Sequence, residues 1–433
     1  MKKNILIISA TPIRNDTNMG KTLKSLFNDF NEFNLYQLYF SPEKPNLNIC
    51  KSYYQIHEKQ LLKSFFGLVK TKCGTVISVS DIELETYSKI TKNNLYFTQR
   101  KNRIDIKILR ELIWGIAYWK NKKLKNWINE IKPDIIFTIM HDNNMITRFV
   151  KSLSSKMNIP VIMFITDDYY NDFIISHNPI RKIYYSRRKR LNNELGKNVK
   201  YLIGCSEKAT NYFKRELNIK NGCTIYTPSN TDLWNIKNKK SKPNSILKIR
   251  YFGNLGIGRN DVLKYIGKTL QIINKDGMKA QLEIYSSVTD KYIIDSLNID
   301  NGSRYMGWVY GDQYIDLLKN SDIVVHVESN DESMMKRTWI SVSTKIADYL
   351  GAGKCILAVG PNSLASIDHL KNAACVVTDL SQLLENLSEL INNENLRDEL
   401  AYKSRELSFQ EHNSKIINKK FKNIFKNIIS ERL

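Results

Sequence analysis

The sequence predicts an α/β protein built from two Rossmann-like units, and three observations support this prediction. Short apolar runs alternate with polar or amphipathic stretches along the first half of the chain. A polar, charged segment with one proline interrupts that alternation at 234–245, and the same pattern restarts after it. A length of 433 residues also suits two domains better than one core. We therefore predict a first domain at 1–240, a second at 246–412 and a terminal helix at 413–433.

The predicted strands are continuous apolar runs, which are typical of strands buried on both faces of a parallel sheet. Helix candidates with apolar residues three or four positions apart lie between them, for example 108–119 and 145–153. In the first half the strand candidates are 5–9, 35–39, 75–78, 135–140, 161–166 and 201–204. In the second half they are 247–252, 281–285, 323–327, 355–359 and 375–377.

The composition argues against several classes of protein. No apolar run is long enough to cross a bilayer. The N-terminus has a basic tip, but polar residues 14–16 follow too soon for a signal peptide, so we interpret it as a first buried strand. The six cysteines are scattered without a CxxC pair, which favours reduced thiols over disulfides or a zinc site. Together these features predict a cytoplasmic protein.

Positive charge is concentrated in the first half of the chain. The formal net charge is +23, and residues 1–240 contain 41 of the 66 Lys and Arg but only 20 of the 43 Asp and Glu. An AT-rich genome would enrich lysine in both halves, so it does not explain the difference between them. A basic half indicates a phosphate-rich partner, either nucleic acid or an anionic lipid surface.

A glycine-rich turn opens the second half. Gly253, Asn254, Gly256 and Gly258 follow a strand candidate and lead through Arg259 into a predicted helix. Glycines let backbone N–H groups approach a phosphate closely, and a helix N-terminus with an arginine stabilises its negative charge. The turn is thus a candidate phosphate site. A purely structural turn between strand and helix is the alternative interpretation.

A second segment, at 343–358, has the pattern of a nucleotide-binding helix. If a helix begins at Ser343 and Thr344, then Lys345 lies in its first turn and can reach a phosphate. Asp348 can accept hydrogen bonds from ribose hydroxyls, as carboxylates do in dinucleotide sites. In the alternative interpretation Asp348 is merely exposed, and Gly353 only caps the helix.

These two segments resemble the donor-binding domain of the retaining GT-B glycosyltransferases that include family 4. Members carry a glycine-rich turn after the first strand of this domain and, later, a stretch of the type S/P-x-K-x-x-E-Y-L-A-x-G-x-P-I-L-A. Residues 343–358 follow that stretch in order, and 284–286, 305–309 and 317–325 resemble other runs of the family. The resemblance covers 245–370 well and the first half more loosely. It implies two Rossmann-like domains facing across a cleft, with the C-terminal helix crossing back to the first.

The resemblance also implies a mechanism. Arg259 and Lys345, with Lys264, would stabilise the departing nucleoside diphosphate while an acceptor hydroxyl attacks the anomeric carbon. It implies a retaining outcome, no metal ion and no cofactor.

Two positions depart from the pattern of the family. Its Glu-x7-Glu pair would place the second carboxylate at Asp348 but the first at Ile340. Glu328, Asp331 and Glu332 are candidates to replace it, and we count Glu328 among the predicted catalytic residues. Residues 354–355 read Lys-Cys where many relatives have a proline.

Polar residues at strand ends of the first half are the remaining catalytic candidates. His141 follows strand 135–140, and Asp167 and Asp168 follow strand 161–166, where ligand crevices of open parallel sheets lie. A core or surface role is the alternative for His141, and a magnesium or manganese site is the alternative for the two aspartates. Gly20 and Lys21 follow the first strand as the glycine-containing loop of GT-B acceptor domains does.

Basic stretches with interleaved aromatic residues predict a membrane-facing surface. Trp114, Trp119 and Trp127 alternate with cations, and residues 63–70 form a further candidate. An ordinary solvated helix face is the alternative in each case. Cations of the terminal helix, Lys415 to Lys426, would add to the same surface. The predicted membrane-facing cations are Arg181, Lys182, Arg187, Arg188, Lys189 and Arg190.

The expected function is sugar transfer from a nucleotide donor, UDP-sugar favoured, to a lipid-linked or polysaccharide acceptor at the cytoplasmic membrane face. Bacterial surface polysaccharide synthesis, such as that of a capsule, is the expected pathway. Alternatives are a sugar-nucleotide epimerase or hydrolase, and a non-catalytic scaffold. A nucleic-acid-binding protein is the rival from another class, but no recognisable binding module is present.

Overall fold

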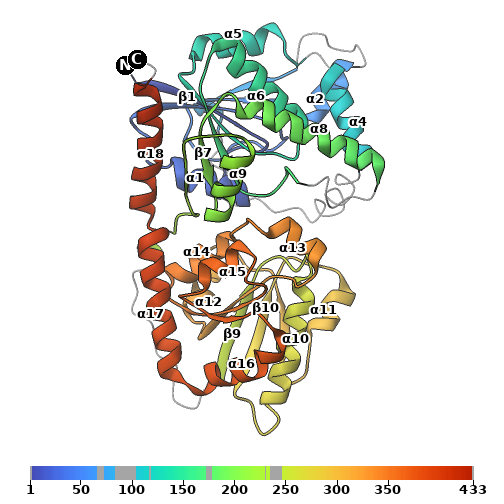
Figure 1. Cartoon of the computed structure of the whole chain (residues 1–433), viewed down its shortest axis with the longest axis vertical. Coiled ribbons are helices and arrows are strands. Elements are labelled where there is room, and N and C mark those ends of the chain that lie inside the picture. Colours follow the sequence, from blue (N-terminus) through green and yellow to red (C-terminus); the bar gives the residue numbers. More distant parts are fainter. Residues whose placement is uncertain are drawn as a thin grey trace. The chain divides into compact units, whose positions relative to one another are not determined.

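The computed structural model describes residues 2–65, 73–82, 104–116, 119–171, 178–229, 231–234 and 246–431. The chain forms two compact units, Met1–Ile225 with Asn418–Leu433, and Tyr226–Ile417 (Figure 1). The division after Ile225 differs from the expected boundary at residue 240. Tyr226 stacks on His369, and Trp234 is buried in a core cluster of the second unit, so this segment folds with that unit. Residues 235–245, most of the predicted linker, lie outside the described residues.

The described part of the first unit contains an eight-stranded sheet with the order β4-β3-β2-β1-β5-β6-β7-β8. All neighbouring strands are parallel except β3 and β4. The strands are β1 (Lys3–Ser9), β2 (Phe33–Tyr39), β3 (Ser52–Gln55), β4 (Thr75–Ser78), β5 (Ile135–Ile139), β6 (Val161–Ile165), β7 (Val199–Gly204) and β8 (Gly222–Thr224).

The six strands predicted for this unit are confirmed. The apolar runs of β1, β5 and β6 are buried on both faces of the sheet, whereas the edge strand β4 exposes Thr75 and Val76. Ile5 to Ile8 of β1, for example, have no exposed surface. The sequence did not predict β3 or β8. The β3 sequence Ser-Tyr-Tyr-Gln has no aliphatic residue, although Tyr53 and Tyr54 are fully buried.

Helices of the first unit connect these strands, and the terminal helix packs with them. The described helices are α1 (Asn18–Phe27), α2 (Glu58–Phe65), α4 (Ile104–Ile116), α5 (Lys122–Ile131), α6 (Asn144–Met157), α8 (Pro179–Gly196), α9 (Glu207–Glu216) and α18 (Ser414–Ser430). From Asn418 onward α18 belongs to the first unit. Its Phe421 and Phe425 make ring contacts with Phe27, Phe30 and Phe137.

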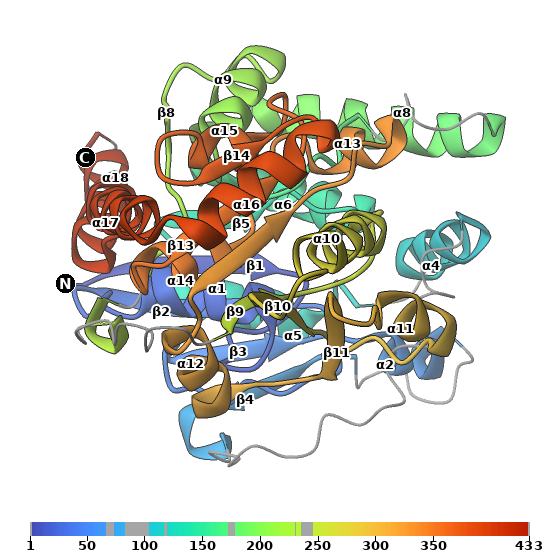
Figure 2. The ribbon, with the colours of Figure 1, turned by 90° about the horizontal axis from the view of Figure 1, so that it is seen from below.

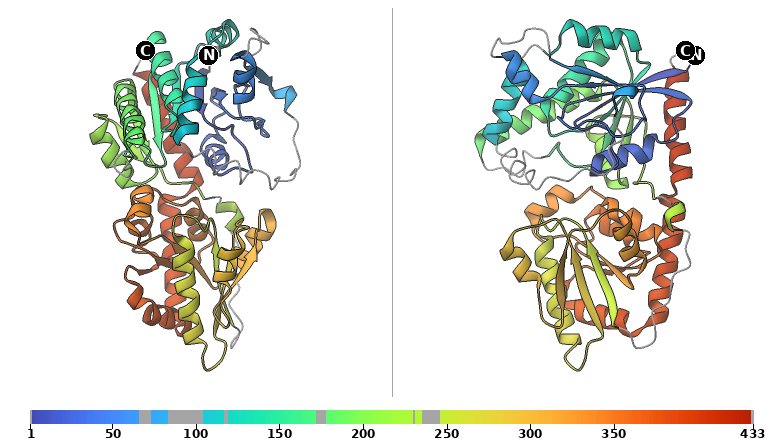
Figure 3. Two further views of the ribbon diagram at one scale, coloured as in Figure 1. Left: turned by 90° about the vertical axis from the view of Figure 1, so that its right-hand side faces the viewer. Right: turned by 180° about the vertical axis from the view of Figure 1, so that it is seen from behind.

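The second unit is built on a parallel six-stranded sheet with the order β11-β10-β9-β12-β13-β14. Figure 3 shows the ribbon of this unit in two views. The strand order is that of a Rossmann fold, and it reverses direction between β9 and β12. Ligands of such sheets bind at the carboxyl ends of the strands beside this switch point. The strands are β9 (Leu247–Phe252), β10 (Ala280–Tyr285), β11 (Ser303–Gly307), β12 (Ile323–Val327), β13 (Cys355–Val359) and β14 (Cys375–Val377). The five strands predicted here are confirmed, and β11 was not predicted.

Alternate residues of these strands point into two separate apolar cores. On β12, Val325 packs with α10 and α16, whereas Val324 packs with α14 and α15. Both faces of the sheet are therefore covered, as the continuous apolar runs predicted. The described helices are α10 (Arg259–Ile273), α11 (Lys291–Leu297), α12 (Gly311–Lys319), α13 (Glu332–Thr338), α14 (Thr344–Gly351), α15 (Ala365–Leu370), α16 (Leu383–Asn392) and α17 (Glu394–Glu411).

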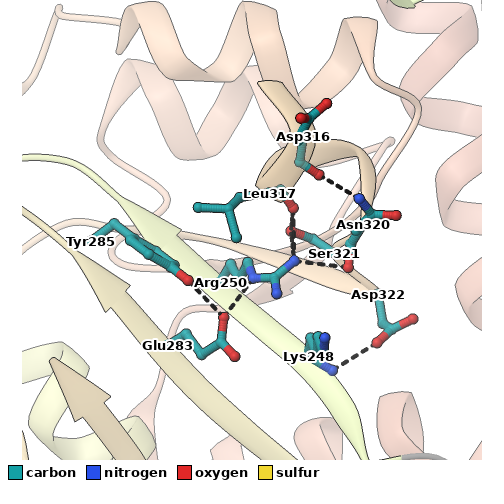
Figure 4. A network of polar contacts seen from close by, with 9 residues as sticks. All are labelled: Lys248, Arg250, Glu283, Tyr285, Asp316, Leu317, Asn320, Ser321 and Asp322. Atoms are coloured by element: carbon teal, nitrogen blue, oxygen red, sulfur yellow. Dashed lines mark hydrogen bonds and ion pairs between the residues drawn. The ribbon is translucent and has the colours of Figure 1, made fainter. Parts of the chain in front are cut away.

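A buried arginine fixes the turn between α12 and β12 (Figure 4). Arg250 of β9 donates to the carbonyl oxygens of Leu317 and Asn320, at 2.7 and 2.8 Å. Its Nε donates to Glu283 of β10 at 2.7 Å, and Tyr285 donates to the same carboxylate at 2.9 Å. The charge is therefore paired, and two carbonyl groups near the end of α12 are satisfied. This network holds α12 against the strands that carry the candidate site.

Candidate functional site

The glycine-rich turn occupies the carboxyl end of β9, at the switch point of the second sheet. Tyr251 donates from its hydroxyl to the Asn254 carbonyl at 2.7 Å, and the Gly256 N–H donates to the Asn254 side chain at 2.7 Å. Gly258 has a φ of 70°, and a Cβ there would lie only 2.4 Å from Ser329 Oγ. Glycine is thus required by both backbone conformation and space. The turn delivers the chain directly into α10, which begins at Arg259 without a side-chain cap among the described residues.

Arg259 forms an ion pair with Glu328, which follows β12. Its Nη2 lies 2.8 and 3.0 Å from the two carboxylate oxygens. Glu328 is almost completely buried, and this burial raises its pKa, although the arginine charge opposes the effect. The pair brings together the first residue of α10 and the strand on the other side of the switch point. The two predicted residues are therefore neighbours, and part of the Arg259 charge is neutralised within the protein.

His326 completes this cluster from within β12. Its Nε2 lies 3.6 Å from Glu328 and has no hydrogen-bond partner among the described residues. Burial lowers the pKa of His326 to about 3, so the ring is neutral at neutral pH. We did not single out this residue from the sequence, because a histidine inside an apolar strand carries no motif.

The N-terminus of α14 presents the second predicted segment. Ser343 is its N-cap, and its hydroxyl accepts a hydrogen bond from the Lys345 N–H at 3.4 Å. Thr344 is exposed, whereas Lys345 and Asp348 are half-buried. Tyr349 ties this helix to β9, because the Phe252 N–H donates to its hydroxyl at 3.2 Å. The two segments that the sequence singled out are thus joined at one end of the sheet.

Tyr314 of α12 contacts both polar residues of α14. Its hydroxyl donates to Asp348 Oδ2 at 2.8 Å, and Lys345 Nζ lies 4.7 Å from the centre of its ring. The sequence did not indicate this residue. Nothing in the local sequence around Tyr314 predicts a contact with a later helix.

The remaining donor-side candidates have individual environments. Lys264 is half-buried in the second turn of α10. Ile340, at the position of the family's first glutamate, is fully buried. Asp331 caps α13 by accepting from the Met334 N–H at 3.0 Å, and Glu332 pairs with Lys336 at 2.7 Å. Among the three candidates to replace that glutamate, Glu328 is the buried one at the strand end.

In the first unit His141 lies at the corresponding switch point, where the strand order reverses between β1 and β5. The residue is buried, and burial lowers its pKa to about 4. Its Nε2 has no hydrogen-bond partner in the part of the chain that the structure describes. A neutral ring at a strand end whose Nε2 lacks a partner among the described residues can bind a ligand hydroxyl, so His141 remains a candidate.

The two aspartates after β6 differ in their environments. Asp168 is buried, and its Oδ1 accepts from the N–H groups of Tyr170 and Asn171, both at 3.0 Å. Its Oδ2 accepts from the Asn171 side chain at 2.9 Å. These contacts give Asp168 a role in holding the turn after β6. Asp167 is half-buried and accepts from Thr166 at 3.3 Å, which makes it the better placed of the two to meet a ligand.

The acceptor-side residues Gly20 and Lys21 lie within α1 rather than in a loop. The Gly20 N–H donates to the capping side chain of Thr17 at 3.2 Å. A Cβ on Gly20 would lie 2.8 Å from the Arg14 nitrogen, so glycine permits a close approach of the preceding loop. Lys21 is exposed.

One predicted membrane-facing residue is wrongly assigned. Arg188 is fully buried, and it donates to the Asp142 carbonyl at 2.5 Å and to the Asn144 side chain at 3.3 Å. Its guanidinium also lies over the rings of Tyr184 and Tyr185. Consecutive residues of a helix point in different directions, so a run of four cations cannot all face one surface.

The other cations of α8 divide into two groups. Lys189 is half-buried, with its ammonium group 4.6 Å from the centre of the Tyr170 ring. Arg181, Lys182, Arg187 and Arg190 are exposed. Ile180 and Ile183 are also exposed, the latter by 72%.

The tryptophans that we expected at the membrane belong to the core. Trp114, Trp119 and Trp127 are all buried, and Trp114 and Trp119 form an edge-to-face pair 5.6 Å apart. Instead α4 exposes Leu109 and Leu112, each by 56%. Helices α4 and α8 lie on the same side of the first unit (Figure 2), where Glu111 and Arg187 approach to 3.7 Å. Of the candidate 63–70, residues 66–70 lie outside the described residues.

Two absences concern only the described residues. None of their helices combines the length and apolar character needed to span a bilayer. They contain no group of three or more His, Cys, Asp or Glu side chains placed to hold a metal ion. Metal independence stays a prediction.

A family comparison matches part of the second unit. Residues 269–420 match a family model described as glycosyl transferase-like. This match covers less than half of the chain and includes α14 with Lys345 and Asp348. No curated protein sequence matches the chain.

Solved structures match the whole chain in fold. A glycosyltransferase from Rickettsia africae is 12% identical with a TM-score of 0.59, covering 99% of each chain. HepE from Anabaena in complex with UDP is 13% identical with a TM-score of 0.60, covering 99% of this chain and all of its own. An α,α-trehalose 6-phosphate synthase from Burkholderia multivorans is 10% identical with a TM-score of 0.65, covering both chains fully. The chain therefore has the GT-B fold, and the family match in its second unit supports a glycosyltransferase of that fold.

Proposed function

We propose that the protein is a retaining, metal-independent glycosyltransferase, similar to family 4, that uses a nucleoside-diphosphate sugar. The observation that carries this proposal is the arrangement at the carboxyl ends of β9 and β12. Arg259 begins a helix directly after a glycine-rich turn, and Lys345 and Asp348 lie on a helix tied to the same strand end. Cations and helix N-termini suit a diphosphate, and a carboxylate suits ribose hydroxyls.

The proposed chemistry needs stabilisation of a leaving diphosphate. When the bond between the anomeric carbon and the diphosphate oxygen breaks, negative charge develops on that oxygen. Arg259, Lys345 and Lys264 supply fixed positive charge, and the N–H groups at the start of α10 supply dipoles. The oxygen of the acceptor hydroxyl forms the new bond to the anomeric carbon, and the hydroxyl proton passes to the departing diphosphate.

UDP-sugars are the donors that we favour. HepE from Anabaena was solved with UDP and with UDP and glucose, and trehalose-6-phosphate synthase from E. coli with UDP-2-fluoro glucose. These proteins share the fold of this chain at low identity, so their ligands guide the choice of compounds.

A thermal-shift panel with UDP, GDP, ADP and their glucose, galactose and N-acetylhexosamine conjugates tests the donor assignment. We expect the compounds of one nucleoside, uridine, guanosine or adenosine, to raise the melting temperature of the protein by several degrees. A ligand that binds only the folded state stabilises that state. Release of the nucleoside diphosphate that occurs only when membrane extract is added as the acceptor source would then show transfer. A protein indifferent to every nucleotide would contradict the proposal.

We also propose that the acceptor is a lipid-linked or polysaccharide glycan at the cytoplasmic face of the membrane, in surface polysaccharide synthesis such as that of a capsule. The support is the surface of α4 and α8, which exposes Leu109, Leu112, Ile180 and Ile183 beside the exposed cations of α8. Apolar side chains flanked by cations suit the headgroup region of anionic bilayers. Peripheral attachment there would bring the enzyme to its acceptor.

One observation favours a second candidate function. Ile340 is buried where relatives carry the first glutamate of their pair, so a protein that binds nucleotide sugars without transferring them, as a scaffold or a sugar-nucleotide-processing relative, fits the same site. Nucleotide-sugar binding without transfer of the sugar to any acceptor would favour this candidate over the transferase.

A further inference from the structure

One aromatic side chain stands between the two polar residues of α14. Asp348 and Lys345 are three positions apart, so both project from one face of the helix. The Tyr314 hydroxyl lies 2.8 Å from Asp348 Oδ2, and the Lys345 ammonium lies 4.7 Å from the centre of the Tyr314 ring. A single residue on another helix therefore contacts both groups.

The hydrogen bond to Asp348 has a defined direction. An ionised carboxylate only accepts, so the phenol must donate. Burial and the nearby Asp348 charge raise the pKa of Tyr314 well above its usual value, which keeps the donor proton in place. A carboxylate can accept about four hydrogen bonds, so one from Tyr314 orients Asp348 and leaves acceptor capacity for ribose hydroxyls.

The contact with Lys345 uses the other part of the tyrosine. A cation within about 6 Å of an aromatic ring centre is attracted to its face. Lysine has a long flexible side chain that loses rotamer freedom when it binds a ligand. The ring thus restricts the ammonium group before a phosphate arrives, and this lowers the entropic cost of binding.

The ring of Tyr314 is itself held in place. It meets Phe252 edge to face, with ring centres 5.1 Å apart and planes at 89°. Phe252 is the last residue of β9, directly before the glycine-rich turn, and it stacks on Tyr285 at the end of β10. The contacts of Tyr314 therefore connect α14 with the strand end that carries the proposed phosphate site.

We propose that Tyr314 is a positioning residue of the donor site: its hydroxyl orients Asp348 toward the ribose, and its ring holds Lys345 for the diphosphate. This inference rests on the proposed function, because it assigns those roles to Asp348 and Lys345. The two halves of the tyrosine serve different parts of the nucleotide, so two substitutions separate them. Tyr314→Phe removes only the hydroxyl, and Tyr314→Leu removes the ring as well.

Titration calorimetry with UDP and GDP, their 2′,3′-dideoxy forms and their monophosphates measures both roles. The ribose contrast is the affinity ratio of diphosphate to dideoxy form, and the phosphate contrast is the ratio of diphosphate to monophosphate. We expect Tyr314→Phe to reduce the ribose contrast about three- to tenfold and to change the phosphate contrast by less than about twofold. Tyr314→Leu should reduce both contrasts.

Tyr305→Phe is the matched control. Tyr305 is a half-buried tyrosine of the same unit whose hydroxyl donates to the Ser286 carbonyl at 2.7 Å. Loss of the Tyr305 hydroxyl should leave the ribose contrast and the phosphate contrast unchanged. Nucleotide binding by the natural protein together with unchanged contrasts in Tyr314→Phe would overturn this inference alone. No binding of any nucleotide by the natural protein would overturn the proposed function and this inference with it.

Discussion

Nη2 of Arg259 donates to both carboxylate oxygens of Glu328, at 2.8 and 3.0 Å, across the switch point of the second sheet. This pair sets how much positive charge the glycine-rich turn offers to an anion. Glu328 is buried and Arg259 is mostly buried, so water screens their attraction only weakly. An incoming diphosphate must therefore share Arg259 with an internal carboxylate.

Replacement of Glu328 by Gln tests this sharing. The variant keeps the shape of the side chain and removes its charge, so UDP or the preferred nucleotide should bind about three- to tenfold more tightly. The unfolding free energy should fall by about 1–3 kcal/mol, because a mostly buried arginine loses its partner. Calorimetry and urea denaturation measure the two effects. Weaker nucleotide binding with unchanged stability would show that Glu328 does not act through Arg259.

Lys345 should contribute to phosphate binding without contributing much to stability. Lys345→Ala should lower affinity for a nucleoside diphosphate at least tenfold and cripple sugar transfer, while the melting temperature changes by less than about 2 °C. Lys371→Ala removes an exposed cation that pairs with Asp368 in the same unit and is the control. A Lys345→Ala variant with full transfer activity would contradict the phosphate role.

The fold could be predicted from the sequence because buried strands leave a strong local signal. All eleven predicted strands are present, and the two-unit division follows from the restart of the pattern. The strands that were missed, such as β3, have polar or aromatic sequences whose burial depends on neighbours distant in the chain. The unit boundary was misplaced because Tyr226 is held by His369, a contact across a long stretch of sequence.

Site residues could be predicted from the sequence only where they belong to a contiguous motif. The glycine-rich turn and the start of α14 are contiguous motifs, and the structure joins them at one sheet end. Tyr314 and His326 lie in ordinary helix and strand sequences, so only three-dimensional packing reveals their contacts. The basic run on α8 led to a wrong prediction for Arg188. Charge is visible in sequence, but the direction in which Arg188 points depends on what surrounds its helix.

Arg188 should therefore affect stability rather than membrane binding. Arg188→Met removes a buried cation that donates to Asp142 and Asn144, and we expect the unfolding free energy to fall by about 2–4 kcal/mol. Arg190→Met, on the exposed face of the same helix, should cost less than about 0.5 kcal/mol. Urea denaturation compares the two variants. Equal stabilities would mean that the buried contacts of Arg188 contribute nothing.

Membrane attachment should depend on the exposed face of α8. A variant with Arg181→Glu, Lys182→Glu and Ile183→Ser should pellet several-fold less with vesicles containing phosphatidylglycerol, because it loses both charge attraction and apolar insertion. Two charge reversals in the second unit, Lys371→Glu and Lys403→Glu, make a control with little expected effect. Binding of the natural protein should weaken in high salt. Equal pelleting of all three proteins would remove α8 from the proposed membrane surface.

The stability of the second unit should decrease in mild acid because of a histidine pair. His412 Nδ1 lies 2.8 Å from the Thr227 carbonyl and must donate to it, so its Nε2 can only accept in the neutral ring. His369 Nε2 therefore donates to His412 Nε2, at 2.8 Å. A proton added to His412 would place two donors against each other.

Burial lowers the pKa of His369 to about 3 and that of His412 to about 4. Between the ordinary pKa near 6.5 and these values, the unfolded chain binds protons that the folded protein does not. As the pH is lowered through this window, the unfolding free energy should therefore decrease by up to about 1.4 kcal/mol per pH unit for each histidine. His326, with a pKa lowered to about 3, acts in the same direction.

His412→Asn separates this pair from the other buried histidines. The variant should be less stable than the natural protein at pH 7.5, because the contact with His369 is lost. It should nevertheless lose less stability between pH 7.5 and 5.0, because one titrating group is gone. Urea denaturation at both pH values measures the difference. If variant and natural protein lost equal stability on acidification, His412 would not be one of the groups that resist protonation in the folded state.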